Sequence, residues 1–192
     1  MESVTFNSFK TMPFIPYNII SHLAQDPKAD NLFKLLKYSS YDALSKPSLT
    51  LQEKIDMINK NQSMQNEYNI FLSRLIEDEQ TKEQSILKIY KAETVPTNAQ
   101  VAVVCYEFDI MCGAKTTVVN YDNIPVSRLD LMESIILESL NGADVNGVGV
   151  LQFNRKLTSS CRSSIGIGNN SNYIGTALVM GVLVSTLDDS RC

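Results

Sequence analysis

Glycine and lysine are distributed unequally along this chain of 192 residues. All eight glycines lie at or after Gly113, and ten of the twelve lysines lie before residue 100. Glycine weakens a helix and is used at turns and bulges, whereas lysine is a good helix former on a solvated face. This asymmetry predicts a helical N-terminal half followed by strands and turns. The expected fold class is therefore α+β, with a mainly antiparallel sheet covered by a helix.

Three short helices are expected in the N-terminal half. The first covers residues 17–24 and ends before Pro27, because a residue that precedes proline avoids the helical region. The second covers residues 31–38, where leucines recur on one face. A capping box begins the third, because the Thr50 hydroxyl can accept from the amide three residues later while Glu53 reaches back.

The second half contains five segments with strand patterns. In the segment 101–112, apolar side chains alternate with Glu107 and Asp109, which predicts a strand with one buried and one solvent-exposed face. Residues 115–120 are expected to return beside it as a hairpin partner. We expect one mainly antiparallel sheet that contains the segments 86–92, 101–112, 115–120, 148–153 and 173–187.

A periodic segment, residues 128–140, gives the strongest helix signal. Its apolar residues recur at helical spacing around Ile136, and Asn141-Gly142 follows as a stop signal. This helix is expected to cover one face of the sheet, with Ile136 in the core.

The chain is expected to form one compact unit with two parts. Residues 1–84 supply an N-terminal arm and a helical segment, and residues 85–192 supply a sheet-plus-helix domain with a long loop at 154–172. A structureless loop of this length is uncommon in a compact domain unless it binds something. Its basic and apolar side chains are the candidate contacts to another subunit: Arg155, Lys156, Arg162, Ile165 and Ile167.

The residue inventory argues against catalysis. The single histidine, His22, lies in an apolar segment, and no serine has the G-x-S-x-G surroundings of a hydrolase nucleophile. The pairs Gly147/Gly149 and Gly166/Gly168 lack the third glycine of a dinucleotide fingerprint. We therefore expect a protein that is not an enzyme and has no cofactor and no metal site.

Charge and hydropathy restrict the possible partners. The formal net charge of −4 disfavours a general nucleic-acid coat, which needs basic clusters. The longest nearly apolar stretch, residues 173–184, is shorter than the roughly 20 residues that span a bilayer. The N-terminus does not resemble a secretory signal, so we expect cytoplasmic synthesis, four cysteine thiols and no membrane partner.

Residues 128–142, followed by residues 147–153, resemble the helix and following strand of the tail-terminator-like group of phage head-to-tail connectors. The segments 31–38, 102–112 and 172–175 fall in the order that this group uses. The resemblance implies a non-catalytic virion subunit, made in the host bacterial cytoplasm, that forms a ring of copies at the portal-to-tail junction. The ring would contact a portal or adaptor protein and tail proteins and surround DNA without sequence-specific binding.

Two features depart from that group, namely the long loop at 154–172 and the extended N-terminal half. They leave open whether the ring is an adaptor, a stopper or the terminator itself. Two other function classes also remain open. One is a cytoplasmic, host-directed binding module that stays monomeric, and the other is a small enzyme with an unrecognised site.

Overall fold

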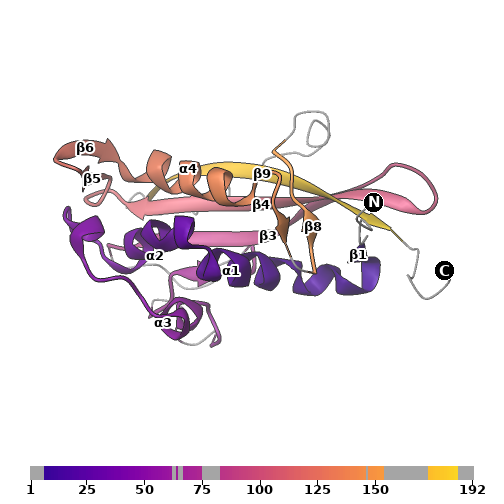
Figure 1. Cartoon of the computed structure of the whole chain (residues 1–192), viewed down its shortest axis with the longest axis horizontal. Helices are drawn as coiled ribbons and strands as arrows, with labels where there is room; N and C mark the ends of the chain where they lie inside the picture. The colour runs from indigo at the N-terminus through magenta and orange to yellow at the C-terminus, as the bar shows by residue number, and fades with distance from the viewer. Residues whose placement is uncertain are drawn as a thin grey trace.

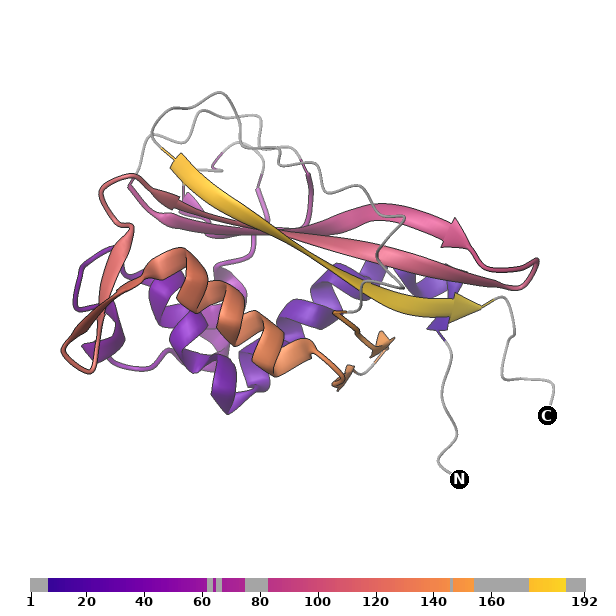
Figure 2. The ribbon, with the colours of Figure 1, turned by 90° about the horizontal axis from the view of Figure 1, so that it is seen from above.

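The computed structural model describes residues 7–61, 64, 67–74, 83–145, 147–153 and 173–185. One twisted five-stranded sheet carries the helices on a single face (Figure 1; Figure 2). Its strand order is β1-β9-β4-β3-β2. The expected α+β class, with an antiparallel sheet and a helical N-terminal part, is confirmed.

Three long strands make the antiparallel centre of the sheet: β3 (Ser85–Pro96), β4 (Val101–Gly113) and β9 (Tyr173–Ser185). β4 pairs with β3 on one side and with β9 on the other. Two short strands add in parallel at the outer edges, β1 (Asn7–Ser8) on β9 and β2 (Ile70–Phe71) on β3.

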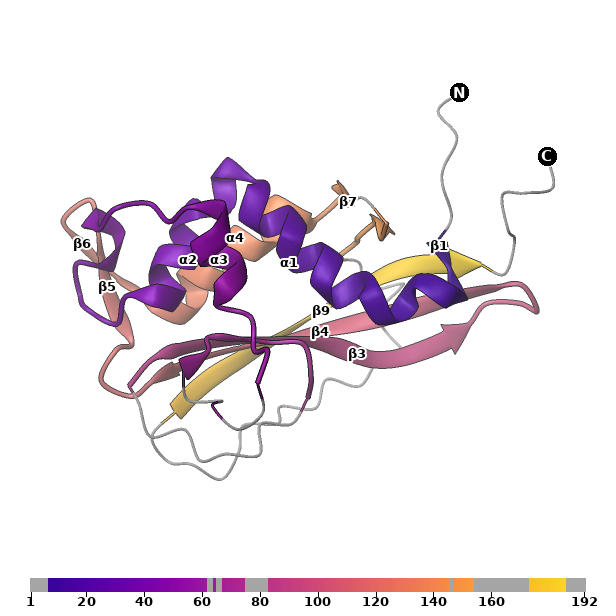
Figure 3. The ribbon, with the colours of Figure 1, turned by 90° about the horizontal axis from the view of Figure 1, so that it is seen from below.

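The helices lie together on one side of this sheet (Figure 3). They are α1 (Ile15–Gln25), α2 (Asp30–Lys37), α3 (Leu51–Asp56) and α4 (Arg128–Leu140), with 3-10 turns η1 (Phe9–Phe14), η2 (Pro27–Ala29) and η3 (Ala43–Ser45). The expected capping box is present, since Glu53 N–H donates to Thr50 Oγ1 and Thr50 N–H donates to Glu53 Oε2. α4 has the expected bounds, with Ser127 as its N-cap and Gly142 in the left-handed region after it.

One hydrophobic cluster joins the two halves of the chain. α1 and α2 contribute Ile19 and Leu32, α4 contributes Ile136, and the sheet contributes Tyr106 and Phe108, all of them fully buried. The apolar stripes of the helices therefore pack on the alternate apolar residues of the sheet.

The expected pairing of residues 115–120 with the strand before them is wrong. β5 (Val118–Tyr121) pairs with β6 (Ile124–Ser127) in a separate hairpin, because β3 and β9 occupy both sides of β4. Asp122 and Asn123 close this hairpin with φ of 50° and 69°. Tight two-residue turns demand such positive φ values, which Asp and Asn tolerate better than most residues.

Residues 148–153 also do not form a full strand of the main sheet. β8 (Gly149–Val150) pairs with β7 (Asp144–Val145) in a second small hairpin. Only Gln152 joins the main sheet, through an antiparallel bridge to Gly181. The expectation of one sheet therefore holds for β3, β4 and β9 and fails for the other two segments.

The polar face of β4 is buried rather than exposed. Glu107 is 0% exposed and Asp109 is 4% exposed. The alternation of the sequence correctly places the two carboxylates on one face, but it cannot reveal that polar side chains of β3 lie beside them.

Candidate functional site

Four polar side chains are buried on the sheet face opposite the helices: Lys88 and Tyr90 of β3, and Glu107 and Asp109 of β4. The residues that alternate with them pack in the helix-covered core, so these four point the other way. The strand register places Lys88 beside Asp109 and Tyr90 beside Glu107. We call this group the far-face cluster.

Asp109 is the centre of the far-face cluster. Lys88 Nζ lies 3.6 Å from Asp109 Oδ2, and Tyr90 Oη donates to the same oxygen at 3.2 Å. Burial raises the pKa of Asp109 against the opposing effect of the Lys88 ammonium. Burial, reinforced by the charge of Asp109, also raises the pKa of Tyr90, so this phenol stays a protonated donor. The cluster is therefore a buried cross-strand network that fixes the register of β3 on β4, and Asp109 Oδ1 has no hydrogen-bond partner among the described residues.

Asp109 is expected to give the stability a specific pH dependence. Because its folded pKa is raised, its contribution is largest below the unfolded pKa, near 3.8, and is lost as the pH rises through the folded pKa. The stability difference between wild type and Asp109→Asn should therefore shrink as the pH rises across this window. Urea unfolding at a series of pH values measures it. Asp144→Asn, at an exposed residue of β7, controls for the loss of one carboxylate, and a pH-independent difference would contradict the expectation.

Arg128, the first residue of α4, is completely buried and donates only to carbonyl groups in the described part of the chain. Nε donates to Thr116 O at 2.7 Å, and Nη1 donates to Leu35 O at 2.8 Å and Tyr38 O at 2.9 Å. Nη2 donates to Ser40 O at 2.9 Å. Leu35 and Tyr38 end α2, where carbonyls lack helical partners and carry negative partial charge.

We call this arrangement the arginine clamp. It ties the end of α2 to the start of α4 and to the residues before β5, so it sets the position of the β5–β6 hairpin. Desolvation lowers the pKa of Arg128, but a guanidinium remains charged in a protein. The clamp is a structural device, because Arg128 is fully buried and four of its five N–H donors bind backbone carbonyl groups.

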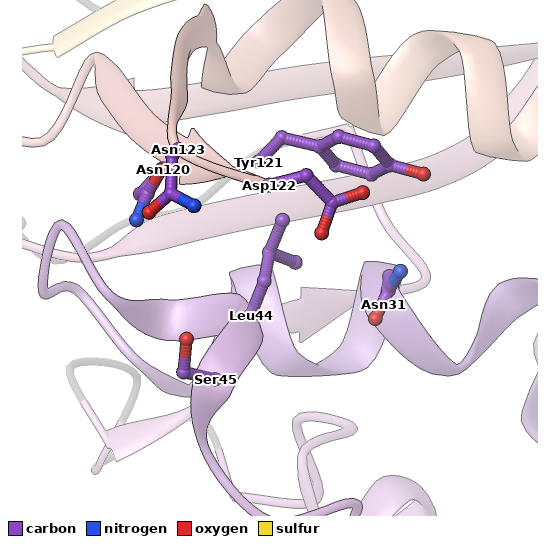
Figure 4. Close-up of a pocket in the computed structure, with 7 residues that line it drawn as sticks. All are labelled: Asn31, Leu44, Ser45, Asn120, Tyr121, Asp122 and Asn123. Carbon is purple, nitrogen blue, oxygen red and sulfur yellow. The ribbon is translucent and has the colours of Figure 1, made fainter.

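A polar hollow of about 330 Å³ lies beside the β5–β6 turn (Figure 4). Asp122 points from the turn toward Leu44 and Asn31 on the facing segment. The described lining contains one carboxylate, no cation and no base beside a nucleophile. Its described lining residues are Asn31, Leu44, Ser45, Asn120, Tyr121, Asp122 and Asn123. This chemistry favours neither phosphate binding nor hydrolysis.

Both long edges of the sheet are only partly paired among the described residues. On the outer side of β9, β1 pairs with Val184 and Ser185 and Gln152 bridges to Gly181, and no described strand lies beside Ile174–Met180 there. On the outer side of β3, β2 pairs with Leu87 and Lys88, and no described strand lies beside Ile89–Pro96 there. The two open edges differ in sequence and lie on opposite sides of β4 (Figure 3). A subunit with two unlike edges suits head-to-tail association, in which one surface meets a different surface on the next copy.

The candidate contact residues of the long loop lie outside the described residues: Arg155, Lys156, Arg162, Ile165 and Ile167. His22 lies half-buried on α1. Among the described residues, no three His, Cys, Asp or Glu side chains gather to hold a metal ion. Every helix in the described ranges is too short or too polar to cross a membrane.

The cysteines differ from one another. Cys112 is a free and buried thiol, as expected. Cys105 is disulfide-bonded, so the expectation of a thiol is wrong there. The spacing of cysteines along a sequence does not reveal which of them meet in space.

One protein-family model, described as YomW, matches residues 29–182. This range runs from the turn before α2 to within three residues of the end of β9, so it includes the arginine clamp and the far-face cluster. No curated protein and no solved structure matches the chain.

Proposed function

The chain belongs to the YomW family, a phage-derived family, and on this premise we propose that it is a structural ring subunit at the phage head-to-tail junction. Copies of the chain would surround the DNA channel, with a portal or adaptor protein on one side and tail proteins on the other. The subunit would catalyse no reaction, and DNA would pass through the ring without sequence-specific binding.

The two unlike open edges of the sheet carry this proposal. A closed ring needs a heterologous interface, and a single sheet with helices on one face and different edges on its two sides meets this need. The resemblance of residues 128–153 to tail-terminator-like connectors supports the same reading. A net charge of −4 suits a channel in which DNA slides without being gripped.

Residues 154–172, which the sequence predicts to be a long loop, are proposed to contact a neighbouring copy or an adjacent ring. Arg155, Lys156 and Arg162 supply charge for such a contact, and Ile165 and Ile167 supply apolar anchors.

Phage particles made without this protein test the proposal. We expect heads and tails that fail to join stably, or heads that lose their DNA, with infectious titre restored when the wild-type chain is supplied from a plasmid. Electron microscopy of the lysate and titration of infectious particles measure both effects. Normal infectious particles without the protein would contradict the neck assignment and favour a host-directed binding module.

A further inference from the structure

The open edge of β9 has an identifiable set of outward hydrogen-bonding groups. Gly181 N–H donates to Gln152 O at 3.0 Å, and Gln152 N–H donates to Gly181 O at 2.9 Å, so both backbone groups of Gly181 point away from β4. Alternate residues of a strand direct their backbone groups to the same side. The N–H and C=O groups of Gly175, Ala177 and Val179 therefore also point outward, where no described strand pairs with them.

Within the described part of the chain, this edge lacks the sequence features that usually prevent strand addition. The stretch Tyr173–Met180 contains no charged residue and no proline, and its register with β4 has no bulge. Exposed edges in stable monomers normally carry one of these protections. Ile174 is 44% exposed, so the start of the edge is accessible. The edge is suited to accept a strand from another chain.

The open edge of β3 offers the complementary groups. Leu87 N–H donates outward to Asn69 O at 2.8 Å, so the backbone groups of Ile89 and Lys91 also point outward. A bulge follows Lys91, and Pro96 ends the strand. β3 and β9 both run antiparallel to β4 and hence point the same way. Because rotation about a ring axis preserves strand direction relative to that axis, β9 of one copy would meet β3 of the next in parallel.

Side-chain charge favours the same pairing. Lys91 is exposed and lies on the helix side of β3, as Leu87 and Ile89 do. On the helix side of β9, Thr176 Oγ1 donates to Glu133 Oε2 of α4 at 3.4 Å, so this carboxylate lies beside the open edge. Joining the two edges brings the ammonium of one copy to the carboxylate of the next.

We propose, on the basis of the ring assignment above, that residues 174–180 of β9 pair in parallel with residues 89–95 of β3 in the next copy. Lys91 then forms an ion pair with Glu133 across the interface, and the sheets join into one surface around the channel. Residues opposite each other in paired strands share a face, so Ile89 lies opposite Ile174 and Lys91 opposite Thr176 across the interface. Within one subunit Ile89 lies level with Leu178, because both pair with Phe108, and Leu178 is four residues beyond Ile174. The strands of neighbouring copies are therefore offset by about 13 Å at a rise of about 3.3 Å per residue, so they tilt relative to the ring axis as in a closed barrel.

Exchanging the charges of Lys91 and Glu133, and measuring how much of each variant enters phage particles, tests this interface. Lys91→Glu, Glu133→Lys and the double variant are each supplied to cells infected with phage that lacks the gene, and the protein in purified particles is quantified by mass spectrometry. Each single variant should reduce incorporation at least tenfold, because every interface of the ring repeats the same contact. The double variant should return to within about threefold of wild type, because the opposite charges meet again.

A backbone variant adds an independent measurement. Ala177→Pro removes only an outward N–H and should reduce incorporation like the single charge variants, whereas Ala177→Val keeps the N–H and should not. Single charge variants incorporated at the wild-type level, or a double variant as poor as the singles, overturn this pairing and leave the neck assignment intact. Wild-type protein absent from purified particles overturns the neck assignment and the pairing with it.

Discussion

Replacing Arg128 by methionine should lower the free energy of unfolding by about 3–5 kcal/mol. This is the range found when one partner of a buried charged interaction is removed and the other partner stays. The guanidinium is fully buried and donates four hydrogen bonds to carbonyl oxygens of Thr116, Leu35, Tyr38 and Ser40. Methionine fills similar space but leaves these acceptors without their donor. Each orphaned buried acceptor costs about 1–3 kcal/mol, reduced where water can reach it.

Two further variants make the Arg128 measurement specific. Arg128→Lys keeps the positive charge but cannot reproduce the planar fork of donors, so it should recover only part of the lost stability. Lys28→Met removes a positive charge from an exposed side chain and should change stability by less than about 0.5 kcal/mol. Urea unfolding followed by circular dichroism measures all three. An Arg128→Met variant as stable as Lys28→Met would contradict the arginine clamp.

Replacing Ile136 by aspartate should unfold the subunit. Ile136 is 0% exposed in the cluster that joins α4 to the sheet and to the N-terminal helices. An unpaired carboxylate there costs several kcal/mol, a large share of the roughly 5–15 kcal/mol by which domains are stable. Ser134→Asp, at an exposed residue of the same helix, should leave the melting temperature within a few degrees of wild type. A normal melting temperature for Ile136→Asp would contradict the burial of this face.

The helices could be predicted from the sequence because their signals are local. The capping box at Thr50 and the stop at Asn141-Gly142 each act within one or two turns of the helix that they bound. Strand pairing is not local. The pattern of residues 115–120 is typical of a strand, but nothing in it states that β9, more than fifty residues later, occupies the place beside β4.

The polar groups of the site were harder to predict. The alternation around Glu107 and Asp109 gives their common face, whereas their burial depends on Lys88 and Tyr90 of another strand. Arg128 did leave a signal, because a cation in the first turn of a helix opposes the helix dipole and implies a partner elsewhere. That partner is the end of α2, about ninety residues earlier, which no local pattern indicates.

The most direct test of the ring assignment is a cryo-electron microscopy reconstruction of the head-to-tail junction in purified particles. The account predicts a ring of copies of this α+β subunit between portal and tail, with β9 of each copy beside β3 of the next. A junction without density for this fold, in particles whose protein content lacks the chain, would contradict it.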